Sequence, residues 1–277
     1  AEGGGYRNYF CEGYRRTALR KKRFVLLTAG TAVLLAGMIC MIYFYMDTGS
    51  ETGLRLQNRN ISAEEYLQCM EAVRYDTTAQ IQDEYGIDPG DKAEWLEEVK
   101  KPEPEDGKKG RGDAETPCEL LMDNTIEKIK QIHAVFEISE EAGYIEGAGY
   151  EDMIERMEAE NERRKEALES GQPVYGLTEY TPELYMEYEL SALRDQYCQD
   201  GSNPGMELTE SETEDYFNSR EWIVGREGEK ASLDSVRVIV EQELRKQKYD
   251  KMIEERAGKI EVTVDREILY QFTADHI

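Results

Sequence analysis

A run of 23 residues without a charged side chain, from Phe24 to Met46, constrains this chain more than any other feature. At about 1.5 Å per residue, a helix of that length reaches roughly 35 Å, enough to cross a hydrocarbon core of about 30 Å. A secretory signal has a shorter apolar core followed by small residues, and the sequence after Met46 lacks that pattern. Cys40 follows Met38 and Ile39, whereas a lipoprotein signal has a small residue directly before its cysteine. The sequence therefore predicts a transmembrane helix over residues 24–46.

Basic residues precede this run and set its expected orientation. Residues 1–23 carry seven Lys/Arg against two Glu, and an excess of positive charge marks the cytoplasmic side of a membrane. We therefore expect a single-pass protein of the cell membrane, with a basic cytoplasmic tail over 1–23, the span over 24–46 and an extracytoplasmic domain over 47–277. Within that domain, residues 100–117 combine Pro, Gly and charge and are expected to form a flexible loop.

The external part is strongly acidic. The whole chain has a net charge of −25 and the first 23 residues contribute +5, so the part beyond the span carries −30. Nucleic-acid binding needs clusters of Lys and Arg against phosphate, and the sequence beyond residue 46 holds only short mixed runs. We interpret the acidity chiefly as a source of solubility and of repulsion between copies, with attraction of cationic partners or divalent ions as the alternative.

Few residues are suited to catalysis or metal binding. The cysteines are Cys11, Cys40, Cys69, Cys118 and Cys198. They lack CxxC or Cys/His spacing, so we expect no zinc site and mostly free thiols. His133 lies beside a helical stripe of apolar residues, which favours a structural role over that of a base, and His276 lies in the tail. Without a nucleophile and base in a defined frame, the chain is expected to be no enzyme and to need no cofactor.

Apolar periodicity beyond the span predicts a mainly α fold with short β-strands at its two ends. Ser62 with Glu65, and Thr209 with Glu212, form capping-box patterns that begin helices. Further helices are expected around Trp95, over about 118–142, over about 150–170, from Pro182, and over about 233–256. Residues 54–57 and 260–264 alternate as strands do. Because a short strand is unstable by itself, we expect these two strands to pair.

Two stretches resemble the SurA/PrsA-type secretion chaperones. "LRLQNRNISAEEY" is similar to the opening of those proteins, and "ENERRKEALESGQPVYGLTEYTPELYMEY" is similar to a stretch of membrane-anchored members from Gram-positive bacteria. The matching residues are Asn58, Ile61, Ser62, Glu65 and Tyr66 in the first stretch, and Asn161, Arg164, Ala167, Gly171, Val174, Tyr175, Gly176, Tyr180, Thr181 and Tyr185 in the second. Arg59 departs from the family, which usually has Gly there. "VTVDREILYQF" is similar to the closing strand of the family.

The resemblance implies a helical cradle of the SurA N-domain and trigger-factor C-domain type, which holds unfolded clients without ATP. Related foldases insert a parvulin prolyl-isomerase domain between the helical parts. Here only residues 218–231 are available for that insert, and the paired histidines of parvulins have no counterpart. Isomerase activity is therefore not expected.

A membrane-anchored, holdase- or foldase-like chaperone for unfolded or newly secreted polypeptides is the function that the sequence favours. An envelope assembly protein with one dedicated partner is the alternative, and a prolyl isomerase with an unrecognised site ranks last. The expected client-binding residues are Tyr175, Tyr185, Met186 and Tyr188. Adaptable Met and aromatic side chains suit this role because they engage many apolar segments weakly.

Overall fold

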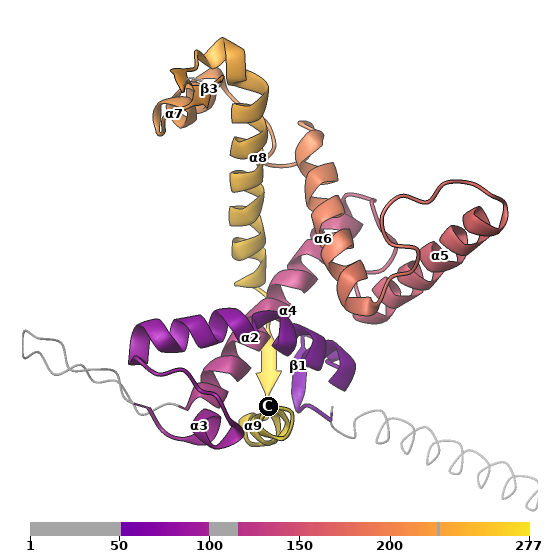
Figure 1. Cartoon of the computed structure of the whole chain (residues 1–277), viewed down its shortest axis with the longest axis vertical. Helices are drawn as coiled ribbons and strands as arrows, with labels where there is room; N and C mark the ends of the chain where they lie inside the picture. Colours follow the sequence, from indigo (N-terminus) through magenta and orange to yellow (C-terminus); the bar gives the residue numbers. More distant parts are fainter. Residues whose placement is uncertain (1–50, 100–115, 226–227) are drawn as a thin grey trace, which may run out of the picture. The chain divides into compact units, whose positions relative to one another are not determined.

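The structure, a computed structural model, describes residues 51–99, 116–225 and 228–277 (Figure 1). This part of the chain is mainly helical. In chain order its helices are α2 (Ala63–Tyr85), α3 (Lys92–Leu96), α4 (Pro117–Glu141), α5 (Tyr150–Glu169), α6 (Pro182–Gln199), α7 (Glu210–Asn218), α8 (Leu233–Ala257) and α9 (Arg266–Asp275). Its strands are β1 (Leu54–Leu56), β2 (Arg59–Asn60), β3 (Ile223–Val224), β4 (Glu229–Lys230) and β5 (Val262–Val264).

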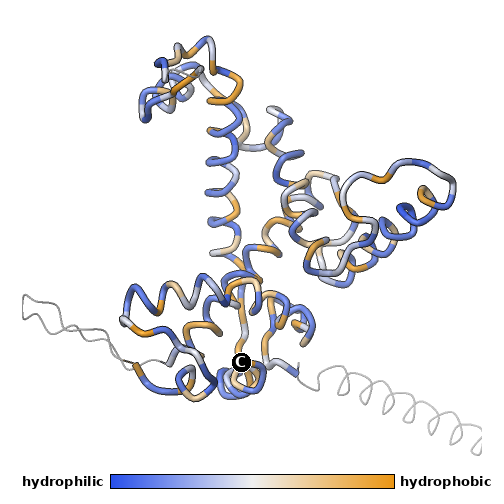
Figure 2. The backbone as a smooth tube through the Cα atoms, in the orientation of Figure 1, coloured by the Kyte–Doolittle hydropathy of each residue, from blue (hydrophilic) through white to orange (hydrophobic). Residues whose placement is uncertain are grey.

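Helix α4 is in contact with α2, α3, α6, α8 and α9, and thus lies at the centre of the packing (Figure 1). A capping box begins it, because Thr116 and Glu119 accept hydrogen bonds from each other's backbone N–H groups. Apolar residues then recur every three or four positions, and Leu121, Ile129 and Phe136 are fully buried. Figure 2 shows apolar positions along α4, whereas the outer turns of α5 are largely hydrophilic.

Strands β1 and β5 join the two ends of the described helical unit. They pair antiparallel, with Leu54 opposite Val264 and Leu56 opposite Val262, and β2 pairs with the other edge of β1. The pairing is extended by hydrogen bonds from Gln57 N to Glu261 O at 2.8 Å and from Asp265 N to Gly53 O at 2.9 Å. The expected pairing of the strands near 54–57 and 260–264 is therefore confirmed.

The last part of the chain differs from its expected form. "VTVDREILYQF" does not continue as one closing strand, because β5 ends at Val264 and α9 begins at Arg266. Asp265 ends the strand and caps the helix, accepting a hydrogen bond from Ile268 N at 3.2 Å. Leu269 and Thr273, four residues apart, are then buried on one face of α9. The strand pattern therefore ends at Val264, and the residues after Asp265 follow a helical period.

Glu65 connects α2 to α4. Ser62 caps α2 as expected, since its hydroxyl accepts from Glu65 N at 3.2 Å, but the Glu65 carboxylate does not return the bond that would complete a capping box. It lies instead 2.7 Å from Nε2 of His133. Both side chains are buried, so each supplies the partner that the other needs away from water. His133 is therefore a structural residue.

Replacing Glu65 by Ala tests this pair. The change leaves the His133 ring buried without a partner, so we expect the free energy of unfolding to fall by about 3 kcal/mol. Urea denaturation followed by circular dichroism measures the loss. Glu64→Ala is the matched control, because Glu64 is the neighbouring residue of the same type and is exposed. Equal stability of the two variants would contradict the structural role of Glu65.

The expected transmembrane helix, residues 24–46, lies outside the described residues, as do the basic tail and most of the expected loop over 100–117. Among the helices that the structure describes, none is both long enough and apolar enough to cross a membrane. Each of these helices carries charged side chains along its length. The fold class with a membrane span is accordingly corrected to a mainly helical fold, and the single-pass membrane localisation that rested on the span is corrected with it.

The three cysteines in the described residues, Cys69, Cys118 and Cys198, are free and buried, in line with the expectation of free thiols. Burial raises the pKa of all three, to about 12 for Cys118 and about 11 for Cys198. A thiol with a raised pKa holds little of the nucleophilic thiolate near neutral pH.

We therefore expect these cysteines to resist alkylation in the folded protein. Treatment with iodoacetamide at pH 8, followed by peptide mass spectrometry, should leave Cys69, Cys118 and Cys198 unlabelled until denaturant is added. Rapid labelling of any of the three in native buffer would contradict their burial. Glutathione serves as the control thiol for reagent activity.

Candidate functional site

Two kinds of site can be examined first in the described part of the chain, a metal centre and a histidine base. Within residues 51–99, 116–225 and 228–277, no group of three or more His, Cys, Asp or Glu side chains is arranged to hold a metal ion. His133 is bonded to Glu65, and Nδ1 of His276 lies 2.8 Å from the carbonyl oxygen of Phe272. Among the described residues, neither histidine is hydrogen-bonded to a nucleophile.

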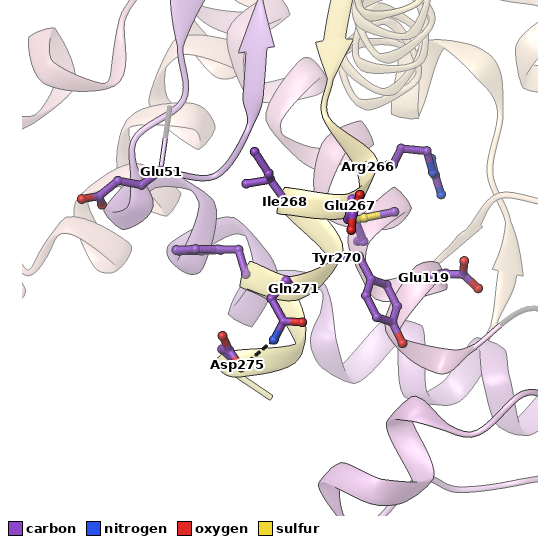
Figure 3. Close-up of a pocket in the computed structure, with 10 residues that line it drawn as sticks. Glu51, Glu119, Arg266, Glu267, Ile268, Tyr270, Gln271 and Asp275 are labelled. Atoms are coloured by element: carbon purple, nitrogen blue, oxygen red, sulfur yellow. Dashed lines mark hydrogen bonds between the residues drawn. The ribbon is translucent and has the colours of Figure 1, made fainter. Parts of the chain in front are cut away.

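A surface pocket of about 730 Å³ lies along α9 (Figure 3). Several of its polar side chains serve the fold: Arg266 forms two hydrogen bonds with Asp123 on α4, at 2.9 and 3.2 Å, and Gln271 donates to Asp275 at 3.0 Å. Glu119, on the opposite wall, caps α4. The pocket thus reflects the docking of α9 on α4 and offers no reactive group.

The connection between α5 and α6 forms a better candidate, because a loop is held there by hydrogen bonds from α5. Asn161 bonds to the backbone of Tyr180 in both directions, donating to Tyr180 O at 2.9 Å and accepting from Tyr180 N at 2.7 Å. Gly171 and Gly176 have positive φ values of 73° and 80°, a conformation that suits glycine. The loop therefore turns at these glycines and is anchored at its end.

Arg164 anchors the middle of the loop. Its side chain is buried, and its guanidinium donates to the carbonyls of Tyr175 and Leu177 and to the Tyr180 hydroxyl. It also bonds to Glu160 at 2.8 Å and lies 4.6 Å from the centre of the Tyr180 ring. A buried guanidinium needs acceptors for its N–H groups. The loop carbonyls supply them, so the charge of Arg164 fixes the loop on α5.

The four predicted client-binding residues have different environments. Tyr175 is 85% exposed, on the loop that Arg164 holds, and Tyr188 on α6 is 47% exposed. Tyr185 and Met186 are buried. Tyr188 stacks on Tyr180 with ring centres 5.2 Å apart, and Tyr185 meets Tyr180 edge-on at 5.5 Å. The structure thus makes Tyr175 and Tyr188 available to a partner and uses Tyr185 and Met186 for internal packing.

Three leucines near these tyrosines were not predicted. Leu168, Leu177 and Leu184 are each between 43% and 47% exposed. Together with Tyr175 and Tyr188 they form what we call the α5–α6 surface. None of the three was expected to bind clients, although the closeness of Leu168 and Leu177 to the turn glycines Gly171 and Gly176 was an available signal. Exposed apolar side chains on neighbouring elements make α5, α6 and the loop between them a candidate for an interaction site.

Acidic residues surround this surface. Residues 150–190 hold twelve Asp/Glu and four Lys/Arg, a net charge of −8. Several cations are already paired: Arg156 bonds to Glu189 at 2.7 and 2.9 Å, and Arg163 bonds to Glu160 at 2.7 Å. Burial, together with the Glu189 charge, raises the pKa of Tyr185. The field around the exposed apolar groups is therefore negative.

Replacing Arg164 by Ala tests the loop anchor. Two carbonyls and the Tyr180 hydroxyl lose their donor, so we expect faster hydrogen exchange over residues 170–181 and a loss of about 2 kcal/mol in unfolding free energy. Exchange followed by mass spectrometry measures the first, and urea denaturation the second. Arg163→Ala is the matched control, since Arg163 is exposed and bonds only to Glu160. Unchanged exchange in R164A would contradict the anchor.

No family model matches this chain. The chain is 32% identical over 218 residues to a protein of Bifidobacterium longum subsp. longum named as a chaperone for lacto-N-biosidase, over 78% of this chain and 73% of that relative. A native and a selenomethionine crystal structure of GH136 lacto-N-biosidase from Eubacterium ramulus are similar at 17% identity, with TM-scores of 0.41 and 0.42. They match 53% of this chain, which spans about 30% of theirs, and likeness at that level carries no argument.

These findings correct the resemblance drawn from the sequence. The relative is a chaperone for lacto-N-biosidase, and nothing found supports a SurA/PrsA-type or trigger-factor-like protein, or the prolyl-isomerase family. The residues behind that resemblance have local explanations: Ser62 caps a helix, while Asn161 and Arg164 hold a loop. Such signals occur wherever a strand leads into a helix or a loop is anchored. The relative is named as a chaperone and not as an enzyme, which agrees with the expectation that this chain is no enzyme.

Proposed function

Since this chain belongs to the family of the chaperone for lacto-N-biosidase, we propose that it is a chaperone dedicated to one partner protein, an enzyme of the lacto-N-biosidase type. The sequence identity over most of both chains carries the proposal. It favours the dedicated-partner alternative over a general holdase for unfolded polypeptides.

The geometry of the α5–α6 surface supports a single partner. A chaperone for many clients gains from mobile side chains that repack around each of them. Here the backbone that carries Tyr175 is bonded to buried Arg164, so little conformational freedom is left for binding to remove. A pre-ordered aromatic side chain binds a matching surface at a low entropic cost.

Individual residues of this surface have distinct roles in the proposal. Tyr175 and Tyr188 contact the partner through their exposed rings. Tyr185, which was also expected to bind clients, acts from beneath by supporting Tyr180 and Tyr188. Met186, the fourth expected residue, is buried and accepts a hydrogen bond from Gln68 on α2 at 3.5 Å. The chain contacts its partner either as a folding intermediate or as a folded protein. In both cases an apolar region of the partner covers the exposed rings.

Co-production tests the proposal. A lacto-N-biosidase from the organism that this chain comes from is produced with and without this chain. Co-production is expected to give several times more soluble, active enzyme. Three unrelated aggregation-prone proteins, tested under the same conditions, are expected to gain nothing. Equal protection of all four would restore the general holdase, and no gain for the lacto-N-biosidase would remove the proposed function.

Tyr175→Ser identifies the surface. We expect about a tenfold loss of affinity for the partner, since a central aromatic residue dominates many interfaces. Tyr75→Ser is the matched control, because Tyr75 lies on α2 with a similar exposed fraction, 82% against 85%. Both variants should keep the melting temperature of the wild type. If Y175S binds as tightly as Y75S, the α5–α6 surface is not the contact.

A further inference from the structure

Further exposed apolar side chains lie on a segment that we call the arm, the described residues of 209–244. It comprises α7, the β3–β4 hairpin and the first half of α8 (Figure 1). Its own buried apolar side chains are Val236, Val240 and Leu244, and these lie outside the main core cluster. The arm therefore depends little on the rest of the molecule for its packing.

Four large aliphatic side chains of the arm face solvent. Ile223 is 63% exposed, Val224 36%, Val238 69% and Ile239 51%. The arm thus leaves more large β-branched side chains exposed than it buries. Transfer of apolar area from water favours association, so such a surface stabilises a complex when a partner covers it.

The hairpin is built to present these side chains. Neighbouring residues of a strand point to opposite faces, so Ile223 and Val224 offer apolar groups on both sides. Two strands of two residues are not stable alone, and the arm holds them through Trp222. Its indole N–H donates to Phe217 O at 3.0 Å, and its ring stacks on Phe217 with centres 6.3 Å apart.

Charge defines what would cover this surface. Residues 209–244 hold ten Asp/Glu and four Lys/Arg, a net charge of −6. The arm's described cations are already paired, as the 3.0 Å Arg220–Glu243, 2.7 Å Lys230–Glu221 and 2.8 Å Arg237–Glu210 contacts show. Glu229 lies opposite Val224 in the hairpin, and no cation of the described residues lies within ion-pair distance of it.

This field discriminates between possible occupants. A second copy of the chain carries −25 and is repelled, and so are anionic lipids and nucleic acids, whose phosphates need cationic patches. A polypeptide with positive charge at the margin of an apolar segment is attracted and complements both features.

We propose that the arm docks a segment of the partner protein that combines aliphatic side chains with flanking lysine or arginine. The aliphatic groups cover exposed side chains of the hairpin and of α8, Ile223 and Val238 among them, while the cations meet Glu229. This docking rests on the proposed function, since the segment belongs to the assisted partner. The partner would then contact this chain at two places, the α5–α6 surface and the arm.

The first test measures binding of the full chain to its lacto-N-biosidase, together with the yield of active enzyme. The double variant Ile223→Thr with Val238→Ala removes apolar area while keeping residues that suit a strand and a helix. We expect it to melt as the wild type does and to bind about tenfold more weakly. Tyr75→Ser is the control for loss of an exposed apolar group elsewhere. Binding by the double variant at wild-type strength overturns the docking inference and leaves the proposed function intact.

The second test needs no enzyme. A fluorescent twelve-residue peptide of alternating Val and Lys is compared with its Val/Glu counterpart by anisotropy. The full chain should bind the Val/Lys peptide at least tenfold more tightly, and both I223T/V238A and Glu229→Lys should reduce that preference more than Asp83→Lys, a charge reversal on an exposed part of α2. Equal effects of E229K and D83K would overturn the inference. Arm-dependent binding of the peptide without any gain in active enzyme would sustain it and reject the proposed function.

Discussion

Burial of α4 by helices on several of its sides is the interaction on which the described structure depends. α2, α3, α6, α8 and α9 all contact it, although they come from distant parts of the sequence. The ends of this unit meet through β1 and β5, and α9 is tied to α4 by Arg266 and Asp123 and to α2 by a 2.6 Å hydrogen bond between Thr273 and Tyr66. Many of the exposed large apolar side chains lie on elements with fewer neighbours, namely α5 with its loop and the arm.

Polar groups in low-dielectric surroundings give this fold its fixed positions. The carboxylate of Glu65 and the ring of His133 orient α2 against α4 because neither has water as an alternative partner. Arg164 acts similarly on a loop, where its buried guanidinium uses backbone carbonyls as acceptors. For function, this means that the backbone of Tyr175 is preorganised before a partner binds. An exposed side chain on a restrained backbone suits one partner better than many.

Acidity acts over longer distances than these contacts. Both exposed apolar surfaces lie in segments of net negative charge, −8 over residues 150–190 and −6 over residues 209–244. Such a field raises the encounter rate with a cationic surface and repels further copies of the chain. Because salt screens it within about 10 Å at 0.1 M, binding that uses it weakens as ionic strength rises, whereas the apolar contribution does not.

Local signals in the sequence determined most of the helices and the strands at both ends. N-caps such as Thr181 and Thr209, and the turn glycines, act within a few residues, so their effect is readable before any tertiary contact is known. The short strands were also predicted to pair, because neither is stable alone. By contrast, the resemblance to SurA/PrsA-type chaperones rested on such local signals and was wrong. Helix α9 was also not predicted, because residues 262–264 before Asp265 alternate as a strand does. Only the tertiary structure decided that Glu65 meets His133, and that Tyr185 and Met186 are buried while Tyr175 and Tyr188 are exposed. It also decided that the arm buries Val236 and Val240 but leaves Ile223, Val224, Val238 and Ile239 in water. The reason is that burial of a helix face depends on which distant segments pack against it, and that information is spread over the whole chain.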